Sequence, residues 1–208
     1  MPTIKVSPFF IIYSTIIVFT DSPYILPTIL GIILHELGHI LCAKILRKKI
    51  TRLTLSPLGA QMKLEGIIPY KDELLIALSG PLLGILGFLF AFPFAHRSEM
   101  CSAFAIISLS LSIFNLLPLP SLDGGRILRC ALCSLVSLNI AEKVSKTLGF
   151  FTLCLLWAFT VYFMIKLAGG LSVFIFCSIF FLKCFVFDAK KGDFKRFQEH
   201  NQDFDMFF

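Results

Sequence analysis

The pentapeptide HELGH, residues 35–39, lies inside an apolar segment, about residues 24–46, that is long enough to cross a membrane as a helix. Residues four positions apart share one face of a helix, so His35 and His39 can both bind one zinc ion. Glu36 would project beside the metal, where a carboxylate can accept a proton from a water molecule. Because ionisable side chains in hydrocarbon cost on the order of a few kcal/mol unless they bind or react, we interpret the motif as a functional site.

The composition is typical of an integral membrane protein. Hydrophobic residues make up 57% of the 208 residues and charged residues only 15%, whereas a soluble domain carries about 25% charged residues. We interpret the net charge of +6 as a sign of membrane topology, because the chain has neither a nucleotide-binding loop nor a basic patch interleaved with aromatic residues. The expected surroundings are therefore a lipid bilayer, and no nucleic-acid partner is expected.

Hydropathy predicts an all-α polytopic membrane fold with about six transmembrane helices and a short β-hairpin after the second. Uncharged runs of about 20 residues match a bilayer core of about 30 Å at a helical rise of about 1.5 Å per residue. The predicted hairpin, about residues 50–68, contains Pro57 and Gly59. The spans are expected at about residues 4–20, 24–46, 73–95, 100–120, 147–165 and 167–187.

The distribution of basic residues predicts the orientation in the membrane. Residues 1–187 are expected to form one six-span domain, and residues 188–208 a short cytoplasmic tail. With the N-terminus in the cytoplasm, only Arg97 and Lys166 of the 19 lysines and arginines lie outside, which leaves 17 inside. Both termini are therefore expected in the cytoplasm, and residues 126–141 are expected to form an amphipathic helix at the inner face.

Asp123 is the predicted third metal ligand. A catalytic zinc usually has three protein ligands and one open position, and Asp123 is the only acid in residues 100–141. Pro118 and Pro120 break the preceding helix and turn Asp123 toward the bundle. Counting from the nearest basic residues places the two histidines about 8–13 Å, and Asp123 about 10 Å, from the cytoplasmic boundary. The two depths agree.

Two further motifs accompany HELGH. N-x-x-P at residues 115–118 is followed by D-G at residues 123–124, and S-G-P occurs at residues 79–81. Together these motifs resemble the site-2 protease family of intramembrane zinc metalloproteases over about residues 24–130, the predicted core of the domain. Gly84 stands where members of that family often have Asn.

Within that family, the chain resembles most the sporulation stage IV proteases that process a pro-sigma factor. The residues that carry this likeness are LSPLG at 55–59 and LDGGR at 122–126, together with the six-span layout. Many of those enzymes have a C-terminal regulatory domain of the cystathionine-synthase type (CBS). We expect no such domain here, because only about 20 residues follow the last predicted span.

The resemblance implies a zinc metalloendopeptidase that cleaves a membrane-associated protein, such as a pro-sigma factor, near the cytoplasmic face. It implies one Zn²⁺ per chain, held by His35, His39 and Asp123, with Glu36 as the general base. Asn115 is implied to hydrogen-bond the substrate backbone near the metal. The same side chain can also brace its own helix.

The predicted hairpin suggests how a substrate is held. A helical substrate shields its scissile amide, so it must be held in an extended conformation. The hairpin can add the substrate as an edge strand, with Pro57 and Gly59 shaping that edge. A membrane inhibitor or regulator is expected in the groove between the hairpin and the fifth and sixth spans, because a protease open to water needs a gate.

Two other functions are compatible with the same sequence features. A divalent-metal transporter can use His35, Glu36, His39 and Asp123 as a transit site, but it is expected to show internal repeats and polar residues along its whole path. A catalytically silent scaffold can bind a client protein in the same groove.

Gly80 is interpreted as a helix-packing residue. Cys130 and Cys133 form a C-x-x-C without a second pair, which is also interpreted as packing.

Overall fold

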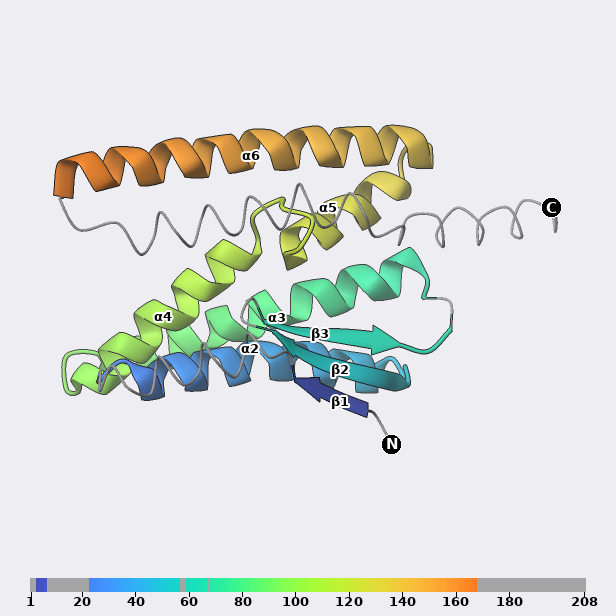
Figure 1. Cartoon of the computed structure of the whole chain (residues 1–208). Coiled ribbons are helices and arrows are strands. Elements are labelled where there is room, and N and C mark those ends of the chain that lie inside the picture. Colours follow the sequence, from blue (N-terminus) through green and yellow to red (C-terminus); the bar gives the residue numbers. More distant parts are fainter. Residues whose placement is uncertain (1–2, 7–22, 57–58, 67, 168–208) are drawn as a thin grey trace.

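The computed structural model describes residues 3–6, 23–56, 59–66 and 68–167. In that part of the chain the protein is mostly helical, with one small β-sheet beside the helices (Figure 1). Most of the predicted first span, almost all of the predicted sixth span and the predicted tail lie outside the described residues. The number of six spans therefore stays a prediction.

Three of the described helices are long and apolar enough to cross a membrane. The first candidate span is helix α2 (Ile25–Ile45). The second, Tyr70–Phe94, consists of helix α3 (Tyr70–Ala91) and the short 3-10 helix η1 (Phe92–Phe94). The third, Leu138–Tyr162, lies within helix α6 (Leu138–Leu167). Helix α4, Glu99–Asn115, is apolar but has only 17 residues. Helices α2, α3, α4 and α6 correspond to the predicted second, third, fourth and fifth spans, respectively.

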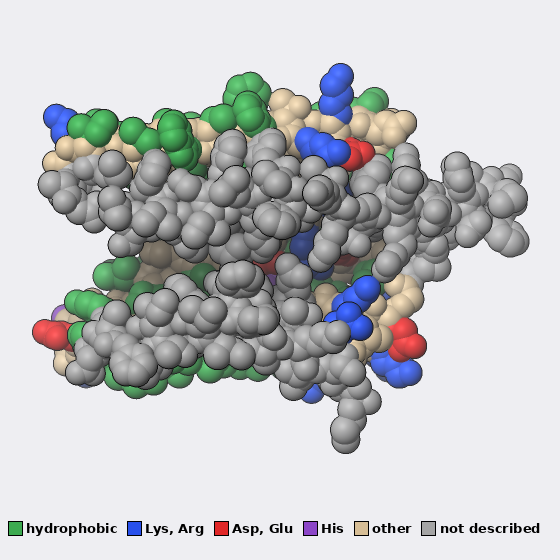
Figure 2. Space-filling model, in the orientation of Figure 1, with side chains coloured by type: hydrophobic (Ala, Val, Ile, Leu, Met, Phe, Trp, Pro, Cys, Tyr) green, Lys and Arg blue, Asp and Glu red, His purple; other side chains and the backbone are tan. Residues whose placement is uncertain are grey.

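Many large hydrophobic side chains are exposed on the outside of the molecule. Hydrophobic side chains cover the outer surfaces of α2 and α6 (Figure 2). Leu37 and Leu41 on α2 and Phe151 and Leu155 on α6 are all exposed. Large apolar side chains on a surface of this extent are suited to hydrocarbon and not to water.

The sheet has three strands where the sequence predicted two. Strand β2 (Ile50–Ser56) pairs antiparallel with β3 (Gly59–Leu64), so the predicted hairpin is present. Strand β1 (Thr3–Val6) adds to the other edge of β2 in parallel, which gives the order β1-β2-β3. The prediction of a helical span from residue 4 is therefore wrong at its start. Hydropathy did not separate the β-branched strand residues Thr3, Ile4 and Val6 from the apolar run that follows.

A short helix follows the break after α4. Helix α5 (Asp123–Cys133) begins at the predicted metal ligand and contacts both α3 and α6. The single helix predicted at residues 126–141 is wrong, because a turn at residues 134–137 separates α5 from α6. Helices α2, α3 and α4 contact one another, and α5 connects this group to α6 (Figure 1).

Candidate metal centre

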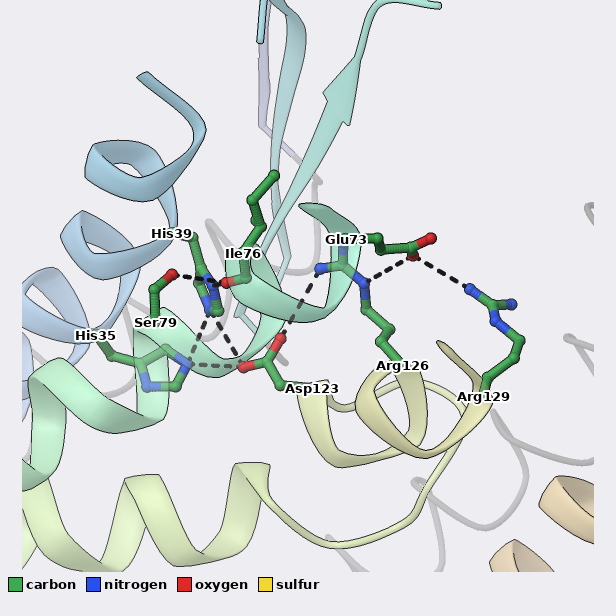
Figure 3. A network of polar contacts seen from close by, with 8 residues as sticks. All are labelled: His35, His39, Glu73, Ile76, Ser79, Asp123, Arg126 and Arg129. Atoms are coloured by element: carbon green, nitrogen blue, oxygen red, sulfur yellow. Dashed lines mark hydrogen bonds and ion pairs between the residues drawn. The ribbon is translucent and has the colours of Figure 1, made fainter. Parts of the chain in front are cut away.

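Three buried side chains from two helices converge on one point (Figure 3). Nε2 of His35 and Nε2 of His39, one turn apart on α2, each lie 3.1 Å from Oδ2 of Asp123 on α5. The two Nε2 atoms are 3.3 Å apart. The exposed fractions of the residues are 4%, 6% and 9% in the same order. The structure thus brings together the three residues that the sequence nominated as metal ligands.

Donor and acceptor counting shows that a cation fits this centre. Nδ1 of His39 is 2.7 Å from the carbonyl oxygen of Ile76 and donates to it, so its Nε2 carries a lone pair in the neutral ring. Oδ2 of Asp123 is also an acceptor. His35 can donate only one proton from Nε2, and its Nδ1 is buried without a partner among the described residues. An additional proton or a metal ion is needed to balance these lone pairs.

The separations match the edges of a tetrahedral zinc site. Zinc binds imidazole nitrogen at about 2.0–2.1 Å in tetrahedral geometry, which places neighbouring ligand atoms about 3.3 Å apart. The observed separations are 3.1, 3.1 and 3.3 Å. The three residues therefore fit a zinc ion with three protein ligands, which leaves the fourth position for water or substrate.

Two glycines allow α2 and α3 to approach at the metal centre. A Cβ atom at Gly38 would lie within 3.0 Å of the Ser79 backbone, and a Cβ atom at Gly80 would lie within 3.0 Å of the His39 ring. The S-G-P element thus makes room for the ligand ring itself. The packing interpretation of Gly80 is consistent with this geometry.

The break after α4 places Asp123 at the start of α5. Side chains at Gly124 and Gly125 would collide with the backbone carbonyls of Leu116 and Leu119, so the loop packs tightly on the first turn of the helix. Leu119 is fully buried in a cluster with Leu122 of the loop and Leu153 of α6. The prolines and glycines of this segment set its geometry.

An acidic residue missed by sequence reasoning lies beside the centre. Glu73, on the first turn of α3, is 8% exposed. Its Oε1 is 3.5 Å from Nε of Arg126 and 3.4 Å from Nη2 of Arg129, both on α5 (Figure 3). In the sequence, Glu73 stands at the edge of an apolar span, where an acid is ordinarily taken as an interfacial charge. The signal available in the sequence was the spacing of Arg126 and Arg129, which places two basic side chains on one face of a helix where they need an acidic partner.

The C-x-x-C pair lies on α5. Burial, reinforced by the nearby negative charge of Glu73, raises the pKa of the Cys130 thiol to about 12. Cys130 is therefore protonated at neutral pH, whereas redox exchange uses the thiolate. This supports the packing interpretation of the pair.

The remaining predicted site residues have different placements. Glu36 is half-buried on α2 beside His35. Nδ2 of Asn115, the last residue of α4, donates to the carbonyl oxygen of Leu111 at 2.9 Å, so in this structure it braces its own helix. Gly59 pairs with Ser56 next to the hairpin turn. Pro57 lies outside the described residues.

The fold and the site define a class: helical proteins with several candidate membrane spans and a buried His-His-Asp group able to hold a metal ion. Residues 94–159 match peptidase family M50. The site-2 protease from Methanocaldococcus jannaschii, a solved structure, has a TM-score of 0.62 and 24% sequence identity, covering 83% of this chain and 86% of that chain. The likeness to this structure shows a shared fold.

Two curated proteins are also similar in sequence. Zinc metalloprotease MJ0392 of Methanocaldococcus jannaschii is 34% identical in an alignment of 130 residues that covers 57% of this chain and 38% of that protein. Stage IV sporulation protein FB of Bacillus subtilis is 32% identical in an alignment of 188 residues that covers 85% of this chain and 65% of that protein. The chain thus spans only part of each relative. The family match and both relatives make this chain similar to peptidase family M50, the family of the site-2 proteases.

Proposed function

We propose that the protein is an intramembrane zinc metalloendopeptidase that cleaves a membrane-associated protein near the cytoplasmic face of the membrane. The observation that carries this proposal is the convergence of Nε2 of His35, Nε2 of His39 and Oδ2 of Asp123, with separations of 3.1 to 3.3 Å. The three atoms form a buried group able to hold a metal ion. Similarity to a metalloprotease family supports peptide hydrolysis as its use.

Each polar side chain of the centre has a proposed role. His35, His39 and Asp123 hold the zinc ion, which when bound polarises a carbonyl group and lowers the pKa of water. Nδ1 of His39 donates to the Ile76 carbonyl oxygen, and this bond orients the ring with Nε2 toward the site. The Glu36 carboxylate accepts the proton of the attacking water and delivers it to the leaving amine.

The sheet supplies the proposed substrate platform. Strand β2 is central, because β1 pairs with one of its edges and β3 with the other. Among the described strands, β3 is paired on one side only and has a second edge that an extended peptide can join. Gly59 starts this strand, and Pro57 precedes it by two residues in the sequence. The Asn115 side chain is proposed to exchange its hydrogen bond to the Leu111 carbonyl for one to the substrate backbone.

The proposed substrate is a membrane-associated transcription-factor precursor, such as a pro-sigma factor. Similarity to Stage IV sporulation protein FB and the motifs shared with the stage IV proteases support this proposal. The proposed topology keeps six spans and both termini in the cytoplasm. A membrane inhibitor that occupies the groove beside the hairpin is the proposed means of control.

A co-expression experiment tests the proposed function. The full chain is produced with candidate membrane-tethered transcription factors, cleavage is scored as a shortened product, and zinc in the purified chain is measured by mass spectrometry. Glu36→Gln is expected to keep zinc and client binding and to reduce cleavage at least about 100-fold. His35→Ala is expected to lose both zinc and cleavage. Glu99→Gln, which alters an exposed acid at the start of α4, is the matched control.

The outcomes separate the alternatives. Normal processing by Glu36→Gln would show that the general-base assignment is wrong. Client binding that survives together with zinc, but without cleavage by the wild type, would identify a scaffold. Zinc uptake into proteoliposomes by the wild type and not by His35→Ala would identify a transporter.

A further inference from the structure

Glu73 is a buried charge that the proposed chemistry does not use. It lies on the first turn of α3, and its Oε1 contacts guanidinium groups of Arg126 and Arg129 at 3.5 and 3.4 Å. The two arginines stand three residues apart and therefore share one face of α5. One carboxylate thus holds two successive turns of a short helix against α3.

The same arginine reaches the proposed metal ligand. Nη1 of Arg126 is 3.9 Å from Oδ1 of Asp123, while Oδ2 of Asp123 faces the two histidines at 3.1 Å. Asp123 therefore has one oxygen toward the metal centre and one toward Arg126 (Figure 3). The contacts form a continuous chain from Glu73 through Arg126 to Asp123.

We propose that Glu73 is a positioning residue for the metal centre. It holds Arg126 and Arg129, and through them it sets the rotation of α5 and the orientation of the Asp123 carboxylate. This inference rests on the proposed metal site. Partners that orient a metal ligand from outside the coordination sphere commonly change metal affinity by about 10- to 100-fold when removed.

A purely electrostatic role makes a different prediction. If Glu73 acted only by its negative charge, removing Arg126 would take a positive charge away from a divalent cation and strengthen zinc binding. If Glu73 acts by positioning, removing Arg126 breaks the same chain and weakens zinc binding. The sign of the Arg126 effect therefore distinguishes the two roles.

The chain offers a matched control one residue away. Asp72 is on the same turn of α3 and has the same charge, but its Oδ2 pairs with Nζ of Lys48 at 2.6 Å. Lys48 follows α2 and is not part of the metal centre. Asp72→Asn removes an acid from the same helix end without breaking the chain to Asp123.

The test uses the full chain, purified in detergent. Zinc affinity is measured by competition with a chromophoric chelator, and the absorption spectrum of the cobalt-substituted protein reports coordination geometry. Glu73→Gln and Arg126→Gln are each expected to weaken zinc binding about 10- to 100-fold and to alter the cobalt spectrum. The double variant is expected to lose no more than either single variant, because the two residues act in one chain. Asp72→Asn is expected to stay within about twofold of the wild type.

Wild-type zinc affinity and a wild-type cobalt spectrum in Glu73→Gln would overturn the positioning role, as would tighter zinc binding by Arg126→Gln. Should Glu73→Gln fail to fold by circular dichroism, Arg126→Gln decides the question, because its native side chain is 32% exposed. A wild-type chain without zinc affinity would overturn the proposed function together with this inference. A zinc-binding wild type with an unaffected Glu73→Gln overturns only the inference.

Discussion

Replacing Gly80 by alanine is expected to displace His39 from the metal centre. The new Cβ would lie within 3.0 Å of Nε2, Cε1 and Cδ2 of the His39 ring, whereas ordinary contacts begin at 3.4 Å. Nε2 is the atom that faces Asp123 at 3.1 Å. The ring cannot swing aside freely, because Nδ1 is bound at 2.7 Å to the carbonyl of Ile76, one turn earlier on α3.

The magnitudes indicate which effect dominates at Gly80. Relieving the collision moves the metal-facing edge of the ring by roughly 1 Å, whereas metal–ligand distances tolerate only about 0.2 Å. Overpacking of this kind costs about 1–3 kcal/mol, which exceeds the gain of about 1 kcal/mol from Gly to Ala in a helix. A misplacement of about 1 Å lowers catalytic rates about 100-fold.

The assay is zinc content and cleavage of a co-expressed client, compared with Gly87→Ala. Gly87 is on the same helix, but its Cβ would meet the terminal Cδ2 methyl of Leu34, which can rotate away. Gly87→Ala is therefore expected to retain zinc and cleavage, while Gly80→Ala loses both. Stoichiometric zinc and full activity in Gly80→Ala would refute the reasoning, because His39 would then not lie where the structure places it.

Three further predictions concern Gly38, the zinc ion and Cys130. Gly38→Ala is expected to push α2 away from the Ser79 backbone and to lower zinc content, because the new Cβ would collide with backbone atoms and no side chain can rotate aside. Zinc at the wild-type level would contradict this. Removing zinc with a chelator is expected to lower the thermal unfolding temperature, because a ligand at a free concentration of 100 times its Kd stabilises the folded state by about 2.7 kcal/mol. An unchanged unfolding temperature after verified zinc loss would argue against a metal site in the folded state. The rate of Cys130 alkylation in the folded chain, followed by mass spectrometry, is expected to be negligible at pH 8 and to rise about tenfold per pH unit. The reason is that burial and Glu73 raise the pKa of the Cys130 thiol to about 12. Rapid alkylation at neutral pH would show that the thiol is not held protonated.

Local patterns in the sequence were sufficient to nominate the metal ligands. The spacing of His35 and His39 follows from the period of a helix, and Asp123 stood out as the single acid of a long apolar segment. The same kind of pattern located α2, α3, α4 and the hairpin. These features depend on hydropathy and on neighbours within a few residues, so they are readable without a structure.

Contacts between distant segments were decided by the tertiary structure alone. Strand β1 could not be recognised, because four residues of which three are β-branched, directly before an apolar segment, resemble the start of a span. The role of Gly80 depends on where the His39 ring points, which no helical period encodes. The partners of Glu73 lie more than 50 positions away on α5, as the separation of 56 residues from Arg129 shows.

The sequence by itself determined which side chains can hold a metal and that they lie among apolar helices. Only the tertiary structure decided that Asp123 comes within 3.1 Å of both histidines, and that two glycines and the acidic Glu73 surround that meeting point. The physical reason is that periodicity and hydropathy are properties of neighbouring residues. Convergence of α2, α3 and α5 depends instead on how whole helices pack against one another.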